Sequence, residues 1–281
     1  MKRRAFIQTS VAATAGMFFL KGCAPVERNA PGLQLYTLRD TIGGDPKGVL
    51  EKVASFGYEK IETFAYFDGK IFGMAFKEFG DFVKGLGMKV TSGHYSLDQA
   101  KSDSWQKAID DANAIGQKFM VVPYLAESDR TSIDDYKRVC EALNKAGELC
   151  NTAGIRFGYH NHAFEFETME GQMPFDLMLA ELDPELVHIE MDIYWVVNAN
   201  QDPLAYFEKY PGRFEQWHVK DMDKNDRQRN ADVGTGSIDW EAIFVKAEQA
   251  GLKHFYVEQE SYPAEPIKSV EASINYLKKI L

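Results

Sequence analysis

The chain has 281 residues, a length that suits one α/β barrel better than two domains of average size. Its formal net charge of −10 argues against a nucleic acid partner, because proteins that bind nucleic acids usually present a basic face. The hydrophobic fraction of 45% is sufficient for a large core, and the charged fraction of 26% is typical of a soluble protein.

The first 23 residues are predicted to be an export signal and not part of the fold. Basic residues at positions 2–4 precede an apolar run at 11–20 that is too short to span a bilayer. Arg3-Arg4 resembles a twin-arginine signal, and residues 20–23 resemble a lipoprotein cleavage box with an atypical lysine. We therefore expect an exported protein, periplasmic or lipid-anchored at Cys23, with the folded domain spanning 24–281. A cleaved signal in which Cys23 is incidental is the alternative.

The two remaining cysteines, Cys140 and Cys150, fall within one predicted helix. Ten residues of helix separate them by roughly 15 Å, which is beyond the reach of a disulfide. No disulfide framework is expected, even in an oxidising compartment.

The chain alternates between strand and helix patterns from residue 32 to its end. Each apolar strand pattern is followed by a helix pattern, and the strands are predicted at 32–37, 58–64, 88–94, 118–124, 155–162, 186–192, 214–220 and 252–258. Eight such units in about 250 residues predict a single-domain (β/α)8 TIM barrel. A doubly wound open sheet is disfavoured, because residues 36–40 lack the glycine-rich phosphate loop that normally follows its first strand.

Several helices have clear start signals. Asp45-Pro46 supplies an N-cap followed by an N1 proline, and Asp202-Pro203 repeats this pattern. Residues 96–99 have the spacing of a capping box, and Ser132 is expected to cap a long helix that stops before Gly154. Other helices are expected at 75–86, 175–182, 237–251 and 267–281.

Ionisable residues fall on the inward parity of the strands, near their carboxyl ends, where TIM barrels carry their active sites. A lone His or Glu at a strand end is more often a cap or a solvated residue, and His188 and His254, early in their strands, are read as structural. Jointly, such buried groups would cost several kcal/mol without a compensating cation or partner. The set therefore predicts a metal or catalytic site, and its members are His94, His160, His162, Glu190, Asp192, His218, Lys220, Glu258 and Glu260.

Three of these residues form a mixed nitrogen and oxygen ligand set. Asp192, His218 and Glu258 end three successive strands. Two carboxylates and an imidazole suit one divalent ion among Mn²⁺, Mg²⁺, Fe²⁺, Co²⁺ and Zn²⁺, without choosing among them. The fourth ligand is expected to be His160 or Glu165.

The motifs resemble those of the xylose-isomerase-like TIM barrels, the sugar isomerase and epimerase superfamily, over the whole chain after the signal. They lie at residues 32–38, 57–62, 159–162, 191–192, 218–221, 233–239 and 257–258. The resemblance implies a metal site of Glu, Asp, His and Glu, of which Asp192, His218 and Glu258 match the last three. His160 stands where the first Glu is expected, so this chain departs from the pair of carboxylates that epimerases place on the two faces of the substrate.

The resemblance implies proton removal next to a carbonyl group, with a metal ion that stabilises the enediolate. Glu258 or Glu165 is expected to take the proton, and Lys220 to stabilise the oxyanion or to donate a proton. His160 is expected to bind the metal and to act as an acid or base. Trp195 is expected either to pack on the sugar or to lie under a loop. Substrate-binding roles are expected for Glu62, His94, His162, Trp195 and Glu260.

Three functions remain open from the sequence. The first is a divalent-metal-dependent sugar isomerase or epimerase. The second is a lyase or hydratase acting on 3-keto-sugars or 3-keto-glycosides, which export and His160 favour. The third is a non-catalytic periplasmic sugar-binding lipoprotein. An endonuclease is disfavoured by the negative charge, and the expected partner is a small sugar or keto-sugar. The oligomeric state is not predicted.

Overall fold

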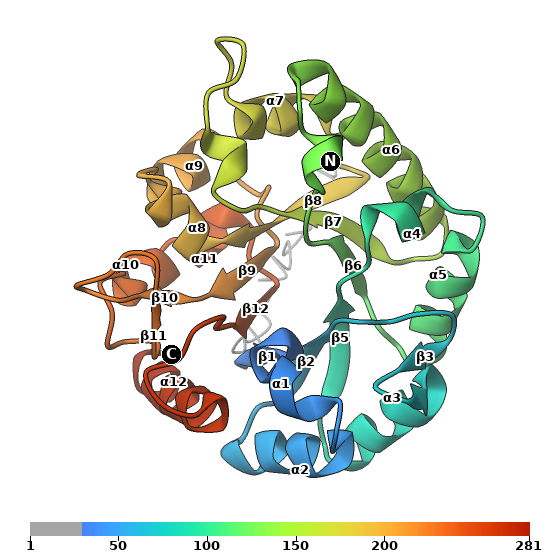
Figure 1. Cartoon of the computed structure of the whole chain (residues 1–281), viewed down its shortest axis with the longest axis vertical. Helices are drawn as coiled ribbons and strands as arrows, with labels where there is room; N and C mark the ends of the chain where they lie inside the picture. Colours follow the sequence, from blue (N-terminus) through green and yellow to red (C-terminus); the bar gives the residue numbers. More distant parts are fainter. Residues whose placement is uncertain (1–29) are drawn as a thin grey trace, which may run out of the picture.

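The computed structural model describes residues 30–281, so the predicted export signal and Cys23 lie outside the described residues. Within this part of the chain, parallel strands follow one another around a central axis (Figure 1) in the hydrogen-bonded order β5, β2, β1, β12, β9, β8, β7, β6. Their bounds are β1 Gly32–Gln34, β2 Lys60–Thr63, β5 Lys89–Gly93, β6 Phe119–Val122, β7 Arg156–His160, β8 Val187–Asp192, β9 Gln216–Val219 and β12 His254–Val257.

The two ends of this sheet meet, which closes it into a barrel. The backbone N–H of Tyr95 donates to the carbonyl of Val121 at 2.9 Å, and that of Lys118 donates to Thr91 at 3.1 Å. The predicted (β/α)8 TIM barrel is confirmed.

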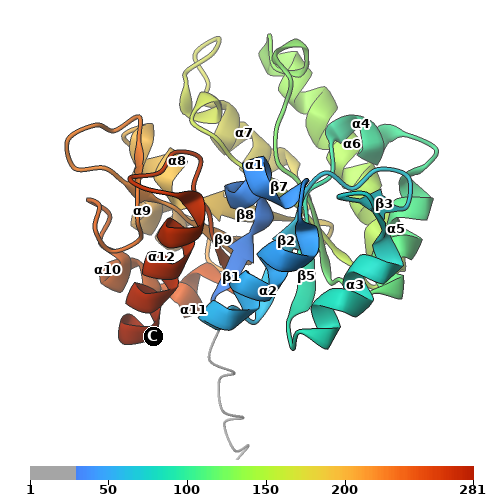
Figure 2. The ribbon, with the colours of Figure 1, turned by 60° about the horizontal axis from the view of Figure 1, so that its bottom comes forward.

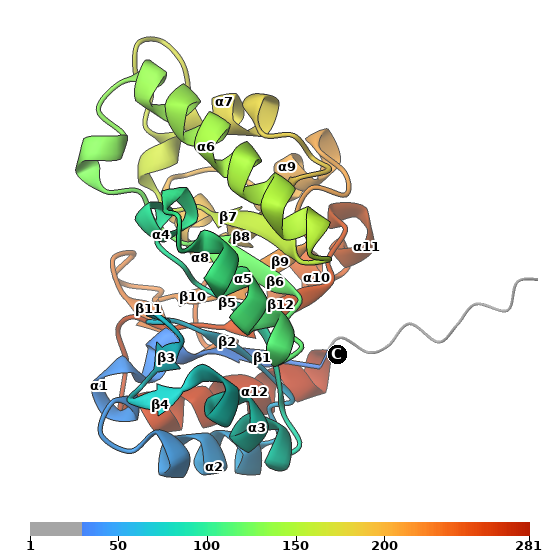
Figure 3. The ribbon, with the colours of Figure 1, turned by 90° about the vertical axis from the view of Figure 1, so that its right-hand side faces the viewer.

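Helices surround the barrel on its outside (Figures 1 and 3). Figure 3 shows α6 and α7 over one wall and α2, α3 and α12 over the other. The bounds are α1 Arg39–Ile42, α2 Pro46–Phe56, α3 Phe76–Gly85, α4 Leu97–Lys101, α5 Trp105–Ala114, α6 Ile133–Thr152, α7 Pro174–Glu181, α8 Ile193–Asn198, α9 Pro203–Lys209, α10 Trp240–Phe244, α11 Ala247–Ala250 and α12 Pro266–Ile280.

Short elements decorate the loops that follow the strands. Figure 2 shows α1, β3 and α4 at one end of the barrel and the chain's C-terminus at the other. These elements are β3 Lys70–Ile71, β4 Met74–Ala75, β10 Asp221–Met222, β11 Asn230–Ala231, η1 Leu35–Leu38, η2 Glu127–Asp129 and η3 Phe164–Phe166.

The predicted helix start signals are found as N-terminal caps in the structure. Asp45 caps α2 through the N–H of Gly48, and the helix ends at Gly57, whose φ of 90° is left-handed. Ser96 forms the reciprocal capping box of α4, and Ser132 caps α6. Local sequence therefore fixes where the chain turns back onto the barrel.

The register of the strands brings the inward residues to common levels. Asp192 on β8 pairs with His218 on β9, and His160 on β7 pairs with Glu190 on β8. The opposite parity faces the helices, as predicted. Trp217 of β9, for example, stacks at 4.9 Å on Phe207 of α9.

Two expected elements differ from the structure. The first strand is predicted to reach Thr37 but ends at Gln34, whose side chain accepts a hydrogen bond from the N–H of Tyr36 and starts a 3-10 turn. The helix predicted over 237–251 is divided into α10 and α11. Cys140 and Cys150 are buried free thiols. None of the helices within residues 30–281 is long and apolar enough to cross a membrane.

Candidate metal and active site

The polar ends of β8, β9 and β12 form what we call the outer group, namely Asp192, His218, Lys220 and Glu258. The Nζ atom of Lys220 lies 2.8 Å from Oδ2 of Asp192 and 2.8 Å from Oε2 of Glu258. His218 Nδ1 lies 2.9 Å from the same Glu258 oxygen. These four side chains are buried, so their charges act on one another with little screening by water.

Charge pairing decides the protonation of Lys220 and Glu258. Burial alone lowers the pKa of Lys220, but the carboxylates of Asp192, Glu258 and Glu260 outweigh it and hold that pKa well above its ordinary value. Burial raises the pKa of Glu258, whereas Lys220 and His218 bring it well below its usual range. Lys220 is therefore an ammonium and Glu258 a carboxylate at neutral pH.

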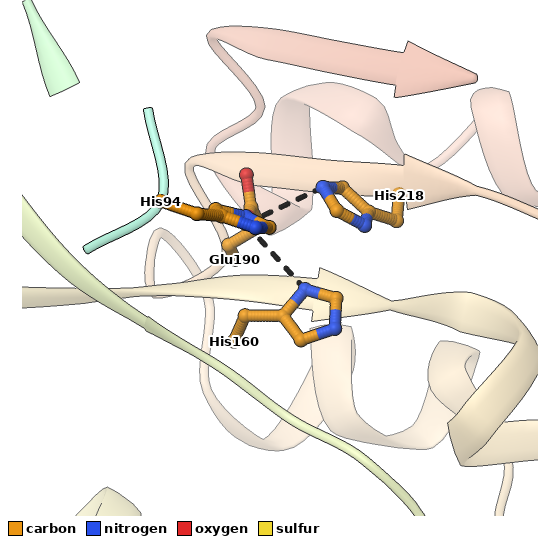
Figure 4. Close-up of side chains that lie close together, drawn as sticks. All are labelled: His94, His160, Glu190 and His218. Atoms are coloured by element: carbon orange, nitrogen blue, oxygen red, sulfur yellow. Dashed lines mark hydrogen bonds and ion pairs between the residues drawn. The ribbon is translucent and has the colours of Figure 1, made fainter. Parts of the chain in front are cut away.

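Beneath the outer group lies a second cluster, the inner group, made by Glu62, His94, His160, Glu190 and His218. Figure 4 shows the three imidazoles converging on Glu190. Oε2 of that carboxylate lies 2.9 Å from His94 Nε2, 3.4 Å from His160 Nδ1 and 3.4 Å from His218 Nε2. Glu62 Oε2 lies 2.7 Å from His218 Nε2, so His218 joins the two groups through its two ring nitrogens.

The inner group balances carboxylates against imidazoles. Burial lowers the pKa of His94, but Glu62 and Glu190 raise it to about 9. Burial and then the charge of Glu62 raise the pKa of Glu190 to about 7. Gln34 donates to Glu62 at 2.8 Å and completes the network.

The neighbouring wall of the site, at the end of β7, carries uncharged imidazoles. Burial lowers the pKa of His160 well below its ordinary value, and the positive charges of His218 and Lys220 add to this effect. Burial and then Lys220 lower the pKa of His162 to about 3. The ring of His162 stacks on Phe164 at 5.5 Å. Both imidazoles are therefore unprotonated proton acceptors at neutral pH.

Trp195 packs beside both His162 and Lys220. Its ring is 5.5 Å from that of His162, and the ammonium of Lys220 lies 5.4 Å from its centroid. Its packing on a sugar stays a prediction.

Glu165 is the one predicted site residue that the structure does not bring to these groups. Its Oε1 accepts a hydrogen bond from the hydroxyl of Tyr159 at 2.5 Å, and its Oε2 accepts one from the N–H of His162 at 2.8 Å. Tyr159 has the outward parity of β7, so the Glu165 carboxylate is turned toward the helices. Instead of reaching a metal or a substrate, it holds the segment that carries His162.

The sequence assigns no specific role to two residues of this network, Glu190 of the inner group and Gln34, which donates to Glu62. Glu190 was recognised as inward by its parity, but it lies one layer below the strand ends. Gln34 ends a strand that was predicted three residues too long, which concealed its position at the rim. Strand parity combined with correct strand ends is the signal that identifies both.

A cavity of about 650 Å³ opens onto the site. Five predicted site residues line it, namely His94, His160, His162, Glu258 and Glu260. Small molecules thus have access to both walls of the site.

The outer group fits a divalent metal ion. Asp192, His218 and Glu258 each offer a ligand atom within 4.8 Å of the others, and the inner group offers a second such set. Among residues 30–281, no hydrogen bond reaches Asp192 Oδ2, although Lys220 forms an ion pair with it. His160 Nε2 lies 3.7 Å from this oxygen. Two carboxylates with one or two imidazoles are donors that such ions accept.

Comparisons with known proteins agree with this architecture. A family model of xylose isomerase-like TIM barrels matches residues 50–280, and the chain belongs to this family. A crystal structure from Parabacteroides distasonis, described as a sugar phosphate isomerase/epimerase, is 30% identical with a TM-score of 0.78. It matches 91% of this chain and 96% of its own.

More distant relatives carry other names. Inosose dehydratase of Clostridium beijerinckii is 23% identical over 165 residues, which cover 52% of this chain and 55% of that enzyme. The chain thus spans about half the length of this curated relative. A structure described as the IolI protein with a bound zinc atom is 12% identical, with a TM-score of 0.70 over 89% of this chain and 97% of its own, and shows the shared fold. The family is thus one of sugar-modifying enzymes, among them isomerases, epimerases and dehydratases.

Proposed function

We propose that this protein is a divalent-metal-dependent lyase that removes water or an alcohol from a keto-sugar or keto-cyclitol by β-elimination, or adds it in reverse. The dehydratase relatives support this reaction type. The observation that carries the proposal is the asymmetry of the two walls. Lys220, a buried ammonium held by Asp192 and Glu258, lies at the ends of β8, β9 and β12, and the neutral imidazoles of His160 and His162 lie at the end of the adjacent strand β7.

This asymmetry favours elimination over two-base epimerisation. Epimerisation through two bases needs a proton acceptor on each face of the carbon that loses its proton. Elimination instead needs one acceptor for the proton next to the carbonyl and one donor for the departing hydroxyl. One neutral base and one charged acid match the second requirement.

We assign the metal ion to the outer group, with Asp192, His218 and Glu258 as ligands and His160 as the fourth. The zinc-containing relative with the same fold supports the presence of a metal. Glu258 and His160 line the cavity, whereas Glu190 of the inner group is fully buried. A bound divalent ion would supply a Lewis acid that draws electron density from the substrate carbonyl.

The chain's own residues then divide the proton transfers. We assign the acceptance of the proton from the carbon next to the carbonyl to His162, because it lines the cavity and none of the described residues hydrogen-bonds to its Nδ1 atom. Lys220 donates a proton to the departing hydroxyl. Glu258, one of the two residues expected from the sequence to be the base, is instead assigned to the metal ion and to the ammonium of Lys220, with which it pairs.

Product analysis tests this proposal. The purified protein with Mn²⁺ or Co²⁺ is incubated with an inosose and with 3-keto-glucose, and the products are followed by NMR and mass spectrometry. Loss of one water with formation of a conjugated ketone is expected. Conversion to an isomer of unchanged mass would overturn the lyase assignment.

Isomerisation or epimerisation is the second candidate, and the 30% identical structure described as a sugar phosphate isomerase/epimerase favours it. This reaction predicts deuterium incorporation from D₂O without loss of water. A non-catalytic sugar-binding protein predicts neither result, so the same experiment separates all three functions.

A further inference from the structure

The lining of the cavity includes residues beyond the polar groups at the strand ends. It extends from His160 and Glu258 outward to Tyr36, Phe64 and Tyr124. Its volume of about 650 Å³ lies in the range of about 300–1,000 Å³ that is usual for pockets holding drug-sized ligands. A single sugar ring bound at the outer group leaves the outer part of this cavity unfilled.

Aromatic rings form the outer part of the cavity. Tyr36 and Phe64 pack edge to face, with centroids 5.2 Å apart, and the guanidinium of Arg39 lies 4.6 Å from the centroid of the Tyr36 ring. Tyr124 packs against Phe164 at 5.6 Å. Tyr36 and Tyr124 are nevertheless 39% and 47% exposed. Rings that are positioned but partly uncovered suit the flat apolar face of a second ring.

The Asp and Glu residues that line the cavity disfavour an anionic substrate. Four carboxylate residues line it (Asp98, Asp129, Glu258 and Glu260), and no lysine or arginine does so among the residues the structure describes. Lys220 is already paired with three carboxylates. Arg39 donates to the carbonyl of Glu260 at 2.8 Å and to the hydroxyl of Tyr262 at 2.8 Å.

One backbone segment that could receive a phosphate is also filled. TIM barrels often bind phosphate at the loops after their seventh and eighth strands, and the glycine-rich segment 233–239 follows the seventh strand here. The carboxylate of Asp221 occupies that segment, because its oxygens accept from the N–H groups of Gly234 at 2.9 Å, Gly236 at 3.2 Å and Ile238 at 3.2 Å. An internal carboxylate thus takes the place of an external anion.

The N-terminus of α4, beside the cavity, also has backbone N–H groups bonded within the protein. The N–H of Gln99 at the start of α4 donates to Ser96 Oγ, and the Gln99 side chain accepts from the N–H of Ser96. Asp98 adds a negative charge to this first turn. The helix terminus therefore does not offer a free anion-binding site.

We propose that the substrate is an uncharged keto-glycoside whose second ring occupies an outer subsite formed by Tyr36, Phe64 and Tyr124, and that phosphorylated sugars are excluded. The assignment of the inner ring rests on the proposed lyase function. It distinguishes this chain from relatives described as acting on sugar phosphates.

Equilibrium binding tests the outer subsite without relying on the reaction. Glucose, p-nitrophenyl glucoside in both anomeric forms, and glucose 6-phosphate carry no ketone, so none is expected to undergo the elimination. Calorimetry with the purified protein is expected to show one glucoside anomer binding at least tenfold more tightly than glucose, with glucose 6-phosphate binding more weakly than glucose. Equal binding of the three probes, binding of none, or tightest binding of the phosphate would overturn the proposal.

Exposed aromatic residues provide the matched variants. Tyr36→Ala and Tyr124→Ala are each expected to reduce the preference for the glucoside at least threefold while leaving glucose binding unchanged. Phe67→Ala is the control, because Phe67 is 75% exposed and does not line the cavity. Loss of the preference in Phe67→Ala, or its persistence in both tyrosine variants, would refute the subsite. If the glucoside preference holds but no keto-sugar is converted, only the proposed reaction fails.

Discussion

The Nζ atom of Lys220 lies 2.8 Å from the Oε2 atom of Glu258, and these side chains are only 0% and 6% exposed. Removing two charges from water costs several kcal/mol for each ion, which their mutual attraction offsets only with good geometry and further partners. Asp192 and Glu260 add such partners for Lys220, and His218 does so for Glu258. The pair is therefore a fixed ammonium beside a fixed carboxylate, at the end of the strands where substrate enters.

Replacement of Lys220 by methionine tests this pair. The variant keeps an apolar chain of similar length but leaves three carboxylates without their ammonium. We expect turnover to fall at least about 100-fold, because a proton donor is lost. In metal-free protein, we expect the free energy of unfolding to fall by about 3–5 kcal/mol. Steady-state kinetics and urea titration measure the two effects.

Lys107→Met is the matched control for this substitution. Lys107 is 49% exposed and pairs with Asp111 one helical turn away at 2.7 Å. Exposed pairs of this kind contribute about 0.3–0.5 kcal/mol, so stability and turnover should change little. Undiminished turnover in Lys220→Met would show that Lys220 is not the proton donor.

Metal content distinguishes the outer group from the inner group. Asp192→Asn removes a proposed ligand, and Glu190→Gln alters a carboxylate that belongs only to the inner group. We expect Asp192→Asn to lower bound metal, measured by plasma mass spectrometry after dialysis, at least tenfold below wild type. Glu190→Gln should retain close to one ion per chain. If Glu190→Gln lost the metal and Asp192→Asn retained it, the metal ligands would instead be His94, His160, Glu190 and His218.

Glu165 predicts a pH dependence of stability. Burial raises its pKa in the folded protein from 4.5 to about 7, against the hydrogen bonds from Tyr159 and His162. Between these pH values the folded protein keeps a proton that the unfolded chain releases, so stability falls as the pH rises. A glutamine does not titrate. The stability of Glu165→Gln relative to wild type should therefore rise by up to roughly 1.4 kcal/mol per pH unit across this window.

Urea titrations of both proteins at pH 5, 6, 7 and 8 measure this difference (these pH values cover most of the window and extend about one unit above it). Effects common to both proteins cancel in the comparison. A difference that stays flat with pH would show that Glu165 is ionised throughout.

Asp221 holds the glycine-rich segment by accepting several backbone N–H groups. Asp221→Ala would leave buried donors at Gly234, Gly236 and Ile238 without partners. Because each unsatisfied buried donor costs about 1–3 kcal/mol, we expect a loss of at least about 3 kcal/mol in urea titration. Asp223→Ala is the control, because Asp223 accepts from two N–H groups in an adjacent exposed turn. Equal losses in the two variants would contradict the role given to Asp221.

The sequence predicts the barrel well because the signals that start its helices depend only on residues close to one another in sequence. Asp45, Ser96 and Ser132 start helices by satisfying backbone N–H groups within a few residues of themselves. The inward parity of β8 and β9 likewise predicts that Asp192 and His218 meet, because their strands are neighbours in register. The export signal and the lipid anchor at Cys23 stay predictions.

The direction of individual side chains is harder to predict from the sequence. Glu165 follows β7 by five residues, and only the folded loop shows that Tyr159 draws it toward the helices. Glu190 becomes part of a network because it contacts His94, which directly follows β5 and lies almost a hundred residues away in sequence. Contacts between residues so far apart in sequence leave no local sequence pattern from which they could be predicted.

The most direct test of the account is the fate of one carbon-bound proton and one hydroxyl. The protein with Mn²⁺, an inosose and 3-keto-glucose are followed by ¹H NMR in D₂O, with mass spectrometry of the products. The account predicts loss of the proton next to the carbonyl together with loss of water, both abolished in His162→Gln and Lys220→Met. Proton exchange that yields an epimer with every hydroxyl retained would contradict it.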